Sequence, residues 1–288
     1  MAETFIPDLL SKIYLAQLDK ILVAKQITNN WWEGEIKQAG DSVKIWTPGN
    51  ITVKNYTKDT DHATPDATTG TDATMNIDQQ KYFNFQIDAI NIAQMPVPVL
   101  EAYLQRAAYA MKDTIDQHIL GLYTGVHADL TVSPTAACSS SVIHTDILKL
   151  GRVMTENNIP VTGRFLVVSP RVKEAINAYL VGRGTQLGDQ ATVNGYVGKF
   201  LGFDIYESNN VVESDEDMSG TASTEVVHNC LAGTNAGITF AMQIPEGNTI
   251  VYRPELRFAT AVKSLMVYGS KMLYSGKGNG LLKAWFTS

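Results

Sequence analysis

Two runs carry the clearest structural signal in this chain: NIPVTGRFLVVSPRVKEAINAYL (158–180) and GYVGKFLGFDIYESNNV (195–211). The first contains a continuous apolar run at 165–168, which is typical of a strand buried on both faces. Ser169-Pro170 follows directly, and a capping serine before a proline predicts the start of a helix. The second run predicts a short strand at 203–206. The order of strand, helix and strand therefore indicates a compact α/β region.

A long helix is predicted before this region, over residues 97–122. Apolar residues recur there at spacings of three and four, and Glu101 suits the positive end of the helix dipole. At about 1.5 Å per residue the helix would be roughly 40 Å long, enough to cross a whole domain. We therefore expect it to act as a structural spine.

The segment before this helix predicts a projection from the folded body. A helical repeat covers residues 5–27, and two alternating runs follow at 43–56 and around 83–87. Between them, residues 55–75 (NYTKDTDHATPDATTGTDATM) have almost no large apolar side chain. The two runs predict a long hairpin whose tip reaches away from the core, because the tip has nothing with which to bury itself. An ordinary disordered surface loop is the alternative.

The C-terminal half alternates helix and strand and then becomes mostly strand. Thr145 is predicted to cap a helix that carries Ile147, Leu150 and Met154. ESDED (213–217) is predicted to be a polar loop, and strands are predicted from about residue 225 onward.

Composition excludes several classes of protein. Only 18% of residues are charged, against roughly 25% in an ordinary domain, while 44% are apolar. That apolar content excludes a disordered chain, and a net charge of -6 argues against a protein that binds nucleic acid by neutralising phosphates. No apolar run is long enough for a membrane helix, and no secretion signal is present, so we expect a soluble cytosolic product with no membrane partner.

No motif with a recognised chemistry stands out. The five histidines occur singly, Gly182, Gly184 and Gly188 miss the dinucleotide-binding spacing, and Cys138 and Cys230 form no metal or disulfide pattern. The acidic residues at 213–217 could attract a hard cation, but they lack the ligand spacing of a calcium loop and we interpret them as a solvated loop. We therefore predict no catalytic, cofactor-binding or metal-binding residue, and a protein that is not an enzyme.

The order of these segments resembles that of a major capsid protein of a tailed bacteriophage. In that family a strand, a Ser-Pro pair and a helix are typically followed by a Gly-x-x-x-Gly-Phe-x-x-x-x-Ser-Asn segment. This sequence matches it at Gly198, Gly202, Phe203, Ser208 and Asn209. The resemblance in element order spans essentially the whole chain.

The resemblance implies an α+β tailed-phage capsid fold. The N-arm would span residues 1–30, and the extended hairpin loop with its flanks would span 31–90. The peripheral domain with the spine helix would combine 91–139 and 247–288, and the axial domain would span 140–246. The acidic loop around 210–224 would point toward the centre of each pentamer and hexamer.

The resemblance also implies a mechanical function. Many copies would self-assemble in the cytoplasm of a bacterial host into an icosahedral shell that encloses double-stranded DNA, which the shell would contact only non-specifically. A separate scaffolding protein is an expected partner, because no scaffolding segment precedes the arm helix; the alternative is a prosegment that has already been removed. A portal and a decoration protein are further expected partners. Some relatives crosslink a lysine to an asparagine; Lys44, Lys54, Lys58 and Asn279 are present, but without a recognisable catalytic glutamate we do not predict the reaction.

Two other classes fit part of the pattern. A tail-tube or other virion protein would share the low charge but lack the long helix, and a soluble enzyme would need a convergent pocket and would remain a monomer. The capsid interpretation gives the low charge a meaning, since neighbouring subunits would cover much of the surface. It predicts that uncharged polar residues line the contacts and that acidic residues concentrate at 213–217.

Overall fold

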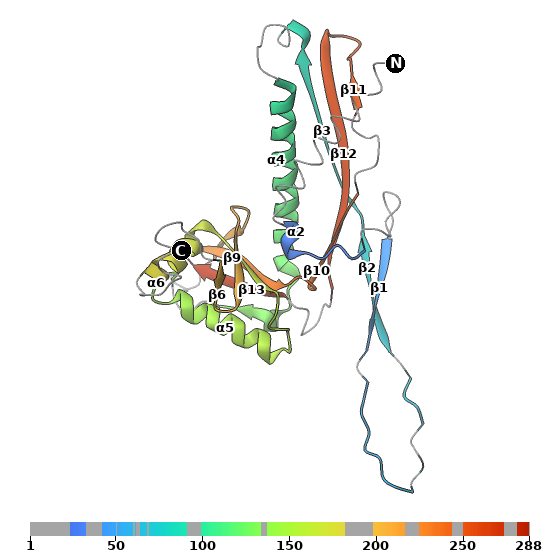
Figure 1. Cartoon of the computed structure of the whole chain (residues 1–288), viewed down its shortest axis with the longest axis vertical. Helices are drawn as coiled ribbons and strands as arrows, with labels where there is room; N and C mark the ends of the chain where they lie inside the picture. Colours follow the sequence, from blue (N-terminus) through green and yellow to red (C-terminus); the bar gives the residue numbers. More distant parts are fainter. Residues whose placement is uncertain are drawn as a thin grey trace.

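The structure, a computed structural model, describes most of the chain between residues 24 and 287. The described residues are 24–32, 42–49, 51–59, 61, 64–67, 69–90, 99–133, 137–181, 198–216, 225–243, 250–273 and 281–287. Three parts are distinct in Figure 1: a long helix beside a narrow sheet, a compact body of helices and strands, and a thin hairpin that projects from the end of the sheet.

The helices are few and the strands many. The α-helices are α2 (Ala24–Ile27), α4 (Val99–Leu120), α5 (Ile143–Glu156) and α6 (Pro170–Val181), with 3-10 turns η2 (Gly121–Gly125) and η3 (Ala128–Leu130). The strands are β1 (Ser42–Pro48), β2 (Gly70–Asn76), β3 (Gln79–Asp88), β4 (Thr131–Val132), β5 (Arg164–Val168), β6 (Lys199–Phe200), β7 (Phe203–Glu207), β8 (Val212–Glu216), β9 (Glu225–Thr234), β10 (Ile238–Gln243), β11 (Ile250–Tyr252), β12 (Ala259–Met272) and β13 (Leu281–Thr287).

The long helix is confirmed as α4, and it ends at Leu120, where a 3-10 turn begins. Its residues before Val99 lie outside the described part. One face of α4 is buried because apolar residues return every three or four positions, at Leu104, Ala108, Met111, Ile115 and Ile119. The helix thus runs the length of the molecule's upper half in Figure 1.

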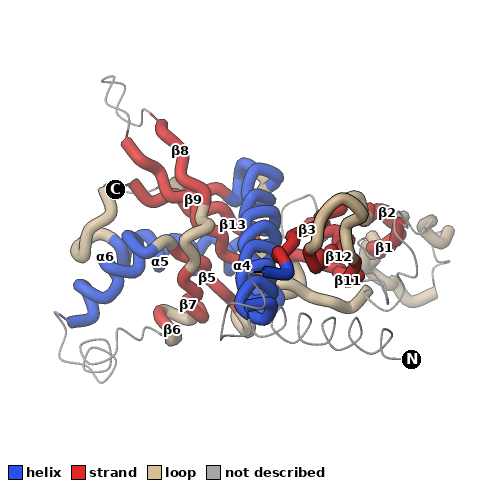
Figure 2. Tube along the Cα trace, turned by 90° about the horizontal axis from the view of Figure 1, so that it is seen from above, coloured by secondary structure: helices blue, strands red, loops and turns tan. Residues whose placement is uncertain are grey.

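A four-stranded antiparallel sheet lies beside α4 (Figures 1 and 2). Its long member is β12, which pairs with β3 along one edge and with β10 and β11 along the other. Leu104 of α4 and Val262 of β12 are fully buried, and the half-buried rings of Phe83 and Phe85 pack against them. The helix and sheet therefore share one thin apolar layer.

The compact body is the predicted α/β region. Its seven-stranded sheet has the order β4-β13-β9-β5-β7-β6, with β8 also paired to β9. All five residues of β5 are buried, and β7 is parallel to it, as the apolar run at 165–168 and the strand at 203–206 predicted. The Ser169 hydroxyl accepts a hydrogen bond from the Val172 N–H at 3.4 Å, which confirms the predicted start of α6.

The predicted hairpin exists, but its pairing was predicted wrongly. β1 pairs with β2 from Ser42↔Asn76 to Pro48↔Gly70, whereas β3 pairs with β12. The predicted partner of β1 was the run at 83–87, because β2 looks polar: only Met75 is a large apolar residue facing the core. The tip therefore begins after Gly49 and ends before Thr69, whereas the predicted tip was 55–75. The Gly49 N–H donates a hydrogen bond to the Thr69 carbonyl at 2.8 Å and closes the paired part of the hairpin.

The acidic segment was also predicted wrongly in part. Residues 212–216 form β8, which pairs with β9 from Val212↔Asn229 to Glu216↔Glu225, and only residues from 217 lie outside the described part. Charged side chains are compatible with a strand at a sheet edge, where one face meets water. Backbone pairing to β9 therefore decided the conformation, and the local composition did not.

Three boundaries differ from the sequence prediction. β13 was expected to complete the domain of the long helix, within 247–288, but it pairs with β9 and β4 in the seven-stranded sheet. β10, expected within 140–246, pairs instead with β12. Helix α5 begins at Ile143 rather than after Thr145, because Ile143 is itself fully buried on the helix's apolar face.

Asn29 fixes the chain that leads out of the N-terminal segment. Its backbone N–H donates to the Ile238 carbonyl at 2.9 Å and its carbonyl accepts from the Phe240 N–H at 3.0 Å. Its side chain donates to the Asn235 carbonyl at 3.1 Å and accepts from the Thr239 hydroxyl at 2.9 Å. Of the predicted helix at 5–27, only Ala24–Ile27 lies within the described residues, and these residues pack on α4.

Gly269 marks the closest approach of β12 to the turn between β2 and β3. A Cβ atom there would lie inside van der Waals contact of the Asn76 carbonyl oxygen and the Ile77 Cα. We predict that Gly269→Ala lowers the free energy of unfolding by about 1–3 kcal/mol, since backbone atoms would have to move. Urea unfolding measures this, with Gly121→Ala as the control, because nothing lies within 4 Å of a Cβ at Gly121. Equal stability of the two variants would contradict the prediction.

Candidate assembly surface

All residues from 51 to 59 in the tip of the hairpin are exposed. Beyond Gly49 the two sides of the hairpin separate, and residues 51–57 have no regular secondary structure and pair with no described strand (Figure 1). Ile51 is 87% exposed and Val53 is 93% exposed. Lys54 Nζ lies 2.7 Å from Asp66 Oδ1, so an ion pair links the two sides of the tip. Large apolar side chains this exposed on a projecting arm indicate a surface for protein contacts.

A second exposed apolar group lies at the opposite end of the molecule. Leu256 and Phe258, in the turn between β11 and β12, are 96% and 92% exposed. The Phe258 carbonyl accepts a hydrogen bond from the Ala89 N–H at 2.9 Å, which ties this turn to the end of β3. Arg253 and Arg257 flank the apolar pair. One exposed apolar group thus lies at the tip of the hairpin, and the other lies in the turn between β11 and β12.

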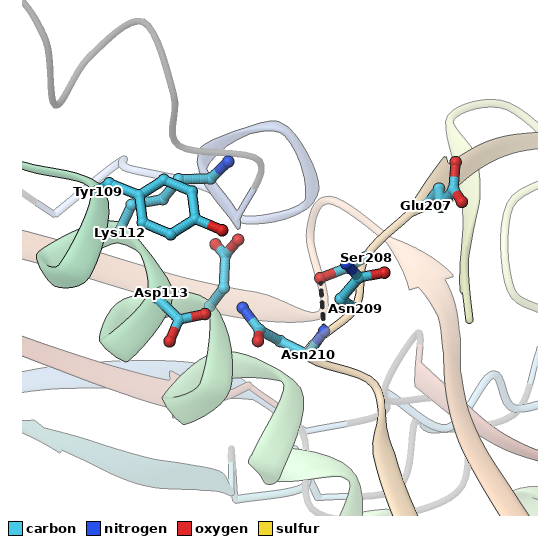
Figure 3. A pocket seen from close by; sticks show the side chains of 8 residues that line it. Tyr109, Lys112, Asp113, Glu207, Ser208, Asn209 and Asn210 are labelled. Carbon is cyan, nitrogen blue, oxygen red and sulfur yellow. Dashed lines mark hydrogen bonds between the residues drawn. The ribbon is translucent and has the colours of Figure 1, made fainter. Parts of the chain in front are cut away.

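A polar pocket of about 280 Å³ lies where α4 meets the compact body (Figure 3). Helix α4 contributes Tyr109, Lys112, Asp113 and Asp116. The last residue of β7, Glu207, and the loop after it contribute residues 207–210. The predicted motif residues Ser208 and Asn209 lie in this loop, where the Ser208 hydroxyl accepts the Asn210 N–H at 3.2 Å. The motif therefore shapes the junction between the two bodies.

Asp116 connects this junction to the N-terminal segment. Its Oδ1 accepts the Ala24 N–H at 3.3 Å, and the side chain is nearly buried. Burial raises the pKa of Asp116, while the Ala24 hydrogen bond acts in the opposite direction. The hydrogen bond holds the start of α2 against the long helix, so the Asp116 carboxylate has a structural role.

The two cysteines, both in the described part of the chain, are poor candidates for reactive groups. Burial raises the pKa of Cys138 to about 11 and that of Cys230 to about 12, so both thiols stay protonated at neutral pH and are weak nucleophiles. Within the described ranges, no group of three His, Cys, Asp or Glu residues could hold a metal ion. The glycines at 182–188, Asp217 and Asn279 lie outside the described residues.

His228 and Glu213 meet across the β8–β9 pair. The ring Nδ1 lies 3.3 Å from the Glu213 carboxylate, and the imidazole is buried while the carboxylate is largely exposed. Burial lowers the pKa of His228, and Glu213 acts in the opposite direction. Burial also lowers the pKa of His118, and its Nε2 lies 2.9 Å from the Ser270 hydroxyl.

These two histidines predict loss of stability in mild acid. The unfolded chain protonates them near their ordinary pKa of 6.5, whereas the folded chain protonates them at lower pH. Their contribution is therefore complete above about pH 6.5 and is lost as pH falls through and below that value. Thermal unfolding between pH 7.5 and pH 5, two values bracketing about 6.5, measures the slope, which His118→Asn with His228→Asn should flatten. An unchanged slope would contradict this assignment.

The comparison with protein families settles the class of protein. The family model described as phage capsid protein matches residues 54–271, which is 218 of 288 residues. The chain belongs to the phage capsid protein family. It is a structural coat protein, as the sequence predicted. The match covers the hairpin tip from Lys54 onward, the long helix, most of the compact body and nearly all of β12, so it includes Leu256 and Phe258 but not Ile51 and Val53.

Solved phage structures share the fold of this capsid protein. The structure titled Mycobacterium phage Che8 has a TM-score of 0.71 at 24% identity, covering 91% of this chain and 89% of the other. The capsid of cyanophage P-SCSP1u gives 0.69 at 16% identity, covering 92% and 88%. The capsid of Ralstonia phage GP4 gives 0.71 at 12% identity, covering 91% and 86%. No curated protein matches the chain.

These matches favour the capsid interpretation over both alternatives. The α+β fold with an extended hairpin and a long helix is shared over nearly the whole chain with capsid structures. The family is a structural one. In the described part of the capsid protein, no helix is long and apolar enough to cross a membrane.

Proposed function

We propose that this capsid protein is the major subunit of an icosahedral shell that encloses double-stranded phage DNA. The observation that carries the proposal is the projecting hairpin, whose apolar residues Ile51 and Val53 are almost fully exposed and would be buried by contact with another subunit. A subunit with several such contacts can assemble through individually weak interfaces, because valency multiplies them. Closure of the shell then leaves few edges exposed.

The two bodies correspond to the expected domains with changed boundaries. We assign the compact body, now including β13, to the axial domain at the centre of pentamers and hexamers. In the same assignment the long helix and the sheet of β3, β10, β11 and β12 would be the peripheral domain, and residues 1–30 would be the N-arm. In this arrangement the acidic β8 edge and residues 210–224 face the capsomer axis, where salt should weaken the repulsion between copies.

Other partners follow from the same proposal. A separate scaffolding protein and a portal would direct closure in the host cytoplasm, and a decoration protein could bind the outer face. The net charge of -6 supports weak and non-specific contact with packaged DNA, because an acidic surface does not attract the phosphate groups. An inner face lined by clustered Lys and Arg in an assembled particle would contradict this last point.

Expression of the chain tests the proposed function directly. Sedimentation and negative-stain microscopy of the purified protein, alone and together with a candidate scaffolding protein from the same phage genome, should reveal capsomers or closed shells. The expected product is many times the 31.5 kDa mass of one chain. A protein that remains a stable monomer under both conditions, even at high protein concentration, would contradict the proposal.

A further inference from the structure

Among the described elements, three crossings of the chain join the compact body to the body formed by α4 and its sheet. Residues 121–130 lead from α4 to β4, residues 235–237 join β9 to β10, and residues 273–280 lead from β12 to β13. Helix α4 also faces the compact body across the polar pocket of Figure 3. The angle between two such bodies is set where the chain crosses between them, because a few residues there absorb any change in direction.

The three crossings touch one another. The Gly237 carbonyl accepts a hydrogen bond from the Leu273 N–H at 3.0 Å, which joins the second crossing to the third. The end of the Met272 side chain occupies the space that a Cβ atom at Gly125 would need, so the first crossing lies against the end of β12. Crossings that meet at one place form a pivot, because the bodies can turn about it while each crossing changes only a few dihedral angles.

Asn29 binds this pivot from the N-terminal segment. Its backbone pairs with β10 on one side of the pivot, through the hydrogen bonds to Ile238 and Phe240. Its side-chain Nδ2 donates to the carbonyl of Asn235, the first residue after β9, at 3.1 Å. The Thr239 hydroxyl donates to Oδ1 at 2.9 Å, which orients the amide so that its NH2 group faces Asn235. One side chain, only 5% exposed, therefore bridges the two ends of the second crossing.

The same N-terminal segment is anchored on α4. The Ala24 N–H donates to Asp116 Oδ1 at 3.3 Å, and the Thr28 hydroxyl donates to the Ala24 carbonyl at 2.9 Å. Ala24 and Ile27 are buried in the apolar core that α4 also lines. Residues 24–29 thus run from the long helix to the pivot and are bonded at both ends.

We propose that residues 24–29 are a strap that fixes the angle between the two bodies, with the Asn29 amide as its clamp. If the amide is removed, the Asn29 backbone can still pair with β10, but the strap no longer holds the Asn235 carbonyl. The second crossing is then free to turn. The strap is a property of the single chain. Its consequence for shells rests on the proposed function, because copies that differ in this angle would meet at different curvatures.

Spin-label distance measurements on the full chain, diluted with unlabelled protein, test the strap. Gln105→Cys on α4 and Leu148→Cys on α5 place the labels on exposed helix positions, one in each body. Native Cys138 and Cys230 are replaced by serine and alanine. We expect one narrow distance peak with Asn29 in place, and a peak about twofold broader or more in Asn29→Ala, because the pivot gains freedom.

Two controls separate a freed angle from general loosening. A label pair within the compact body, Leu148→Cys with Ala178→Cys on α6, should give the same peak with and without Asn29→Ala. Asn30→Ala is the matched substitution and should keep the narrow peak between the bodies, because the Asn30 side-chain oxygen accepts no hydrogen bond within the described part of the chain. Asn29→Asp is a second test, since it keeps the acceptor for Thr239 but cannot donate to Asn235, and it should broaden the peak as Asn29→Ala does.

The outcomes separate this inference from the proposed function. Equal peak widths with and without Asn29→Ala would overturn the strap, and so would equal broadening of the label pair within the compact body. If the wild-type chain forms particles of one diameter, Asn29→Ala should give a spread of diameters. A single diameter despite a broad peak would overturn the link to curvature. Failure of the wild-type chain to assemble would count against the proposed function, while the spin labels would still decide the strap.

Discussion

Replacing residues 50–68 by Asn-Gly should abolish shell assembly and leave the monomer folded. The design follows the register of β1 and β2, which continues to Gly49 and Thr69, so a two-residue turn closes the shortened hairpin. Gly70 is kept, because the Trp46 indole occupies the space of its missing side chain. A shorter loop also costs less closure entropy, so we expect the free energy of unfolding of the shortened monomer not to fall. Sedimentation measures the loss of particles.

A second variant separates the reach of the tip from its contacts. Ile51→Ser, Val53→Ser and Tyr56→Ser together keep the full length of the hairpin but remove its exposed apolar side chains. We expect this variant also to lose particles, because these side chains would be buried only between subunits. Normal shells from the shortened variant would contradict an essential contact at the tip. Unfolding of the shortened monomer would show that residues 50–68 belong to the core.

Arg164→Ala should be among the most destabilising single substitutions in the compact body. The Arg164 side chain is only 5% exposed, and it ties the end of α5 to the start of β5. Its guanidinium donates to the carbonyls of Ile159 at 2.7 Å and Pro160 at 2.8 Å. Two further hydrogen bonds reach the Gly151 carbonyl at 3.3 Å and the Thr155 hydroxyl at 3.2 Å. Removing it leaves buried acceptors unpaired and should cost about 2–4 kcal/mol.

Arg152→Ala is the matched control for this prediction. Arg152 lies on α5, which Arg164 contacts, but the ion pair of Arg152 with Glu156 is exposed on both sides and should contribute less than about 1 kcal/mol. Arg164→Lys should not restore stability, since an ammonium cannot donate along the planar fork that reaches separate carbonyls. Urea unfolding of the three variants tests the assignment, and equal stability of Arg164→Ala and Arg152→Ala would refute it.

Local sequence patterns predicted the elements whose signal is contained in neighbouring residues. The buried strand β5, the Ser169-Pro170 helix start and the long helix α4 were all predicted within a few residues, because periodicity and capping act over single turns. The projecting hairpin was predicted too, since a run of polar residues cannot build a core. Its exposed apolar residues Ile51 and Val53 were noticed as a strand, but nothing local shows that their partner is absent.

Pairings between distant segments could not be predicted in this way. β2 was missed because a strand with one buried face and a single large apolar residue resembles a polar loop. Arg164 was missed for another reason: its four acceptors lie nearby, at residues 151–160, but no residue pattern marks a backbone carbonyl as the partner of an arginine. The Ser208-Asn209 motif was recognised, whereas its place beside α4 required the structure.

The sequence by itself determined that this chain has an apolar body, a long helix and an arm without a core, and its segment order pointed to a phage capsid protein. Only the tertiary structure decided that β1 pairs with β2, that β13 closes the compact sheet and that β3 pairs with β12. The physical reason is that helices and caps are stabilised by neighbours in the chain, whereas a strand is defined by a partner that can lie anywhere. In a shell-forming protein that partner can also belong to the next subunit.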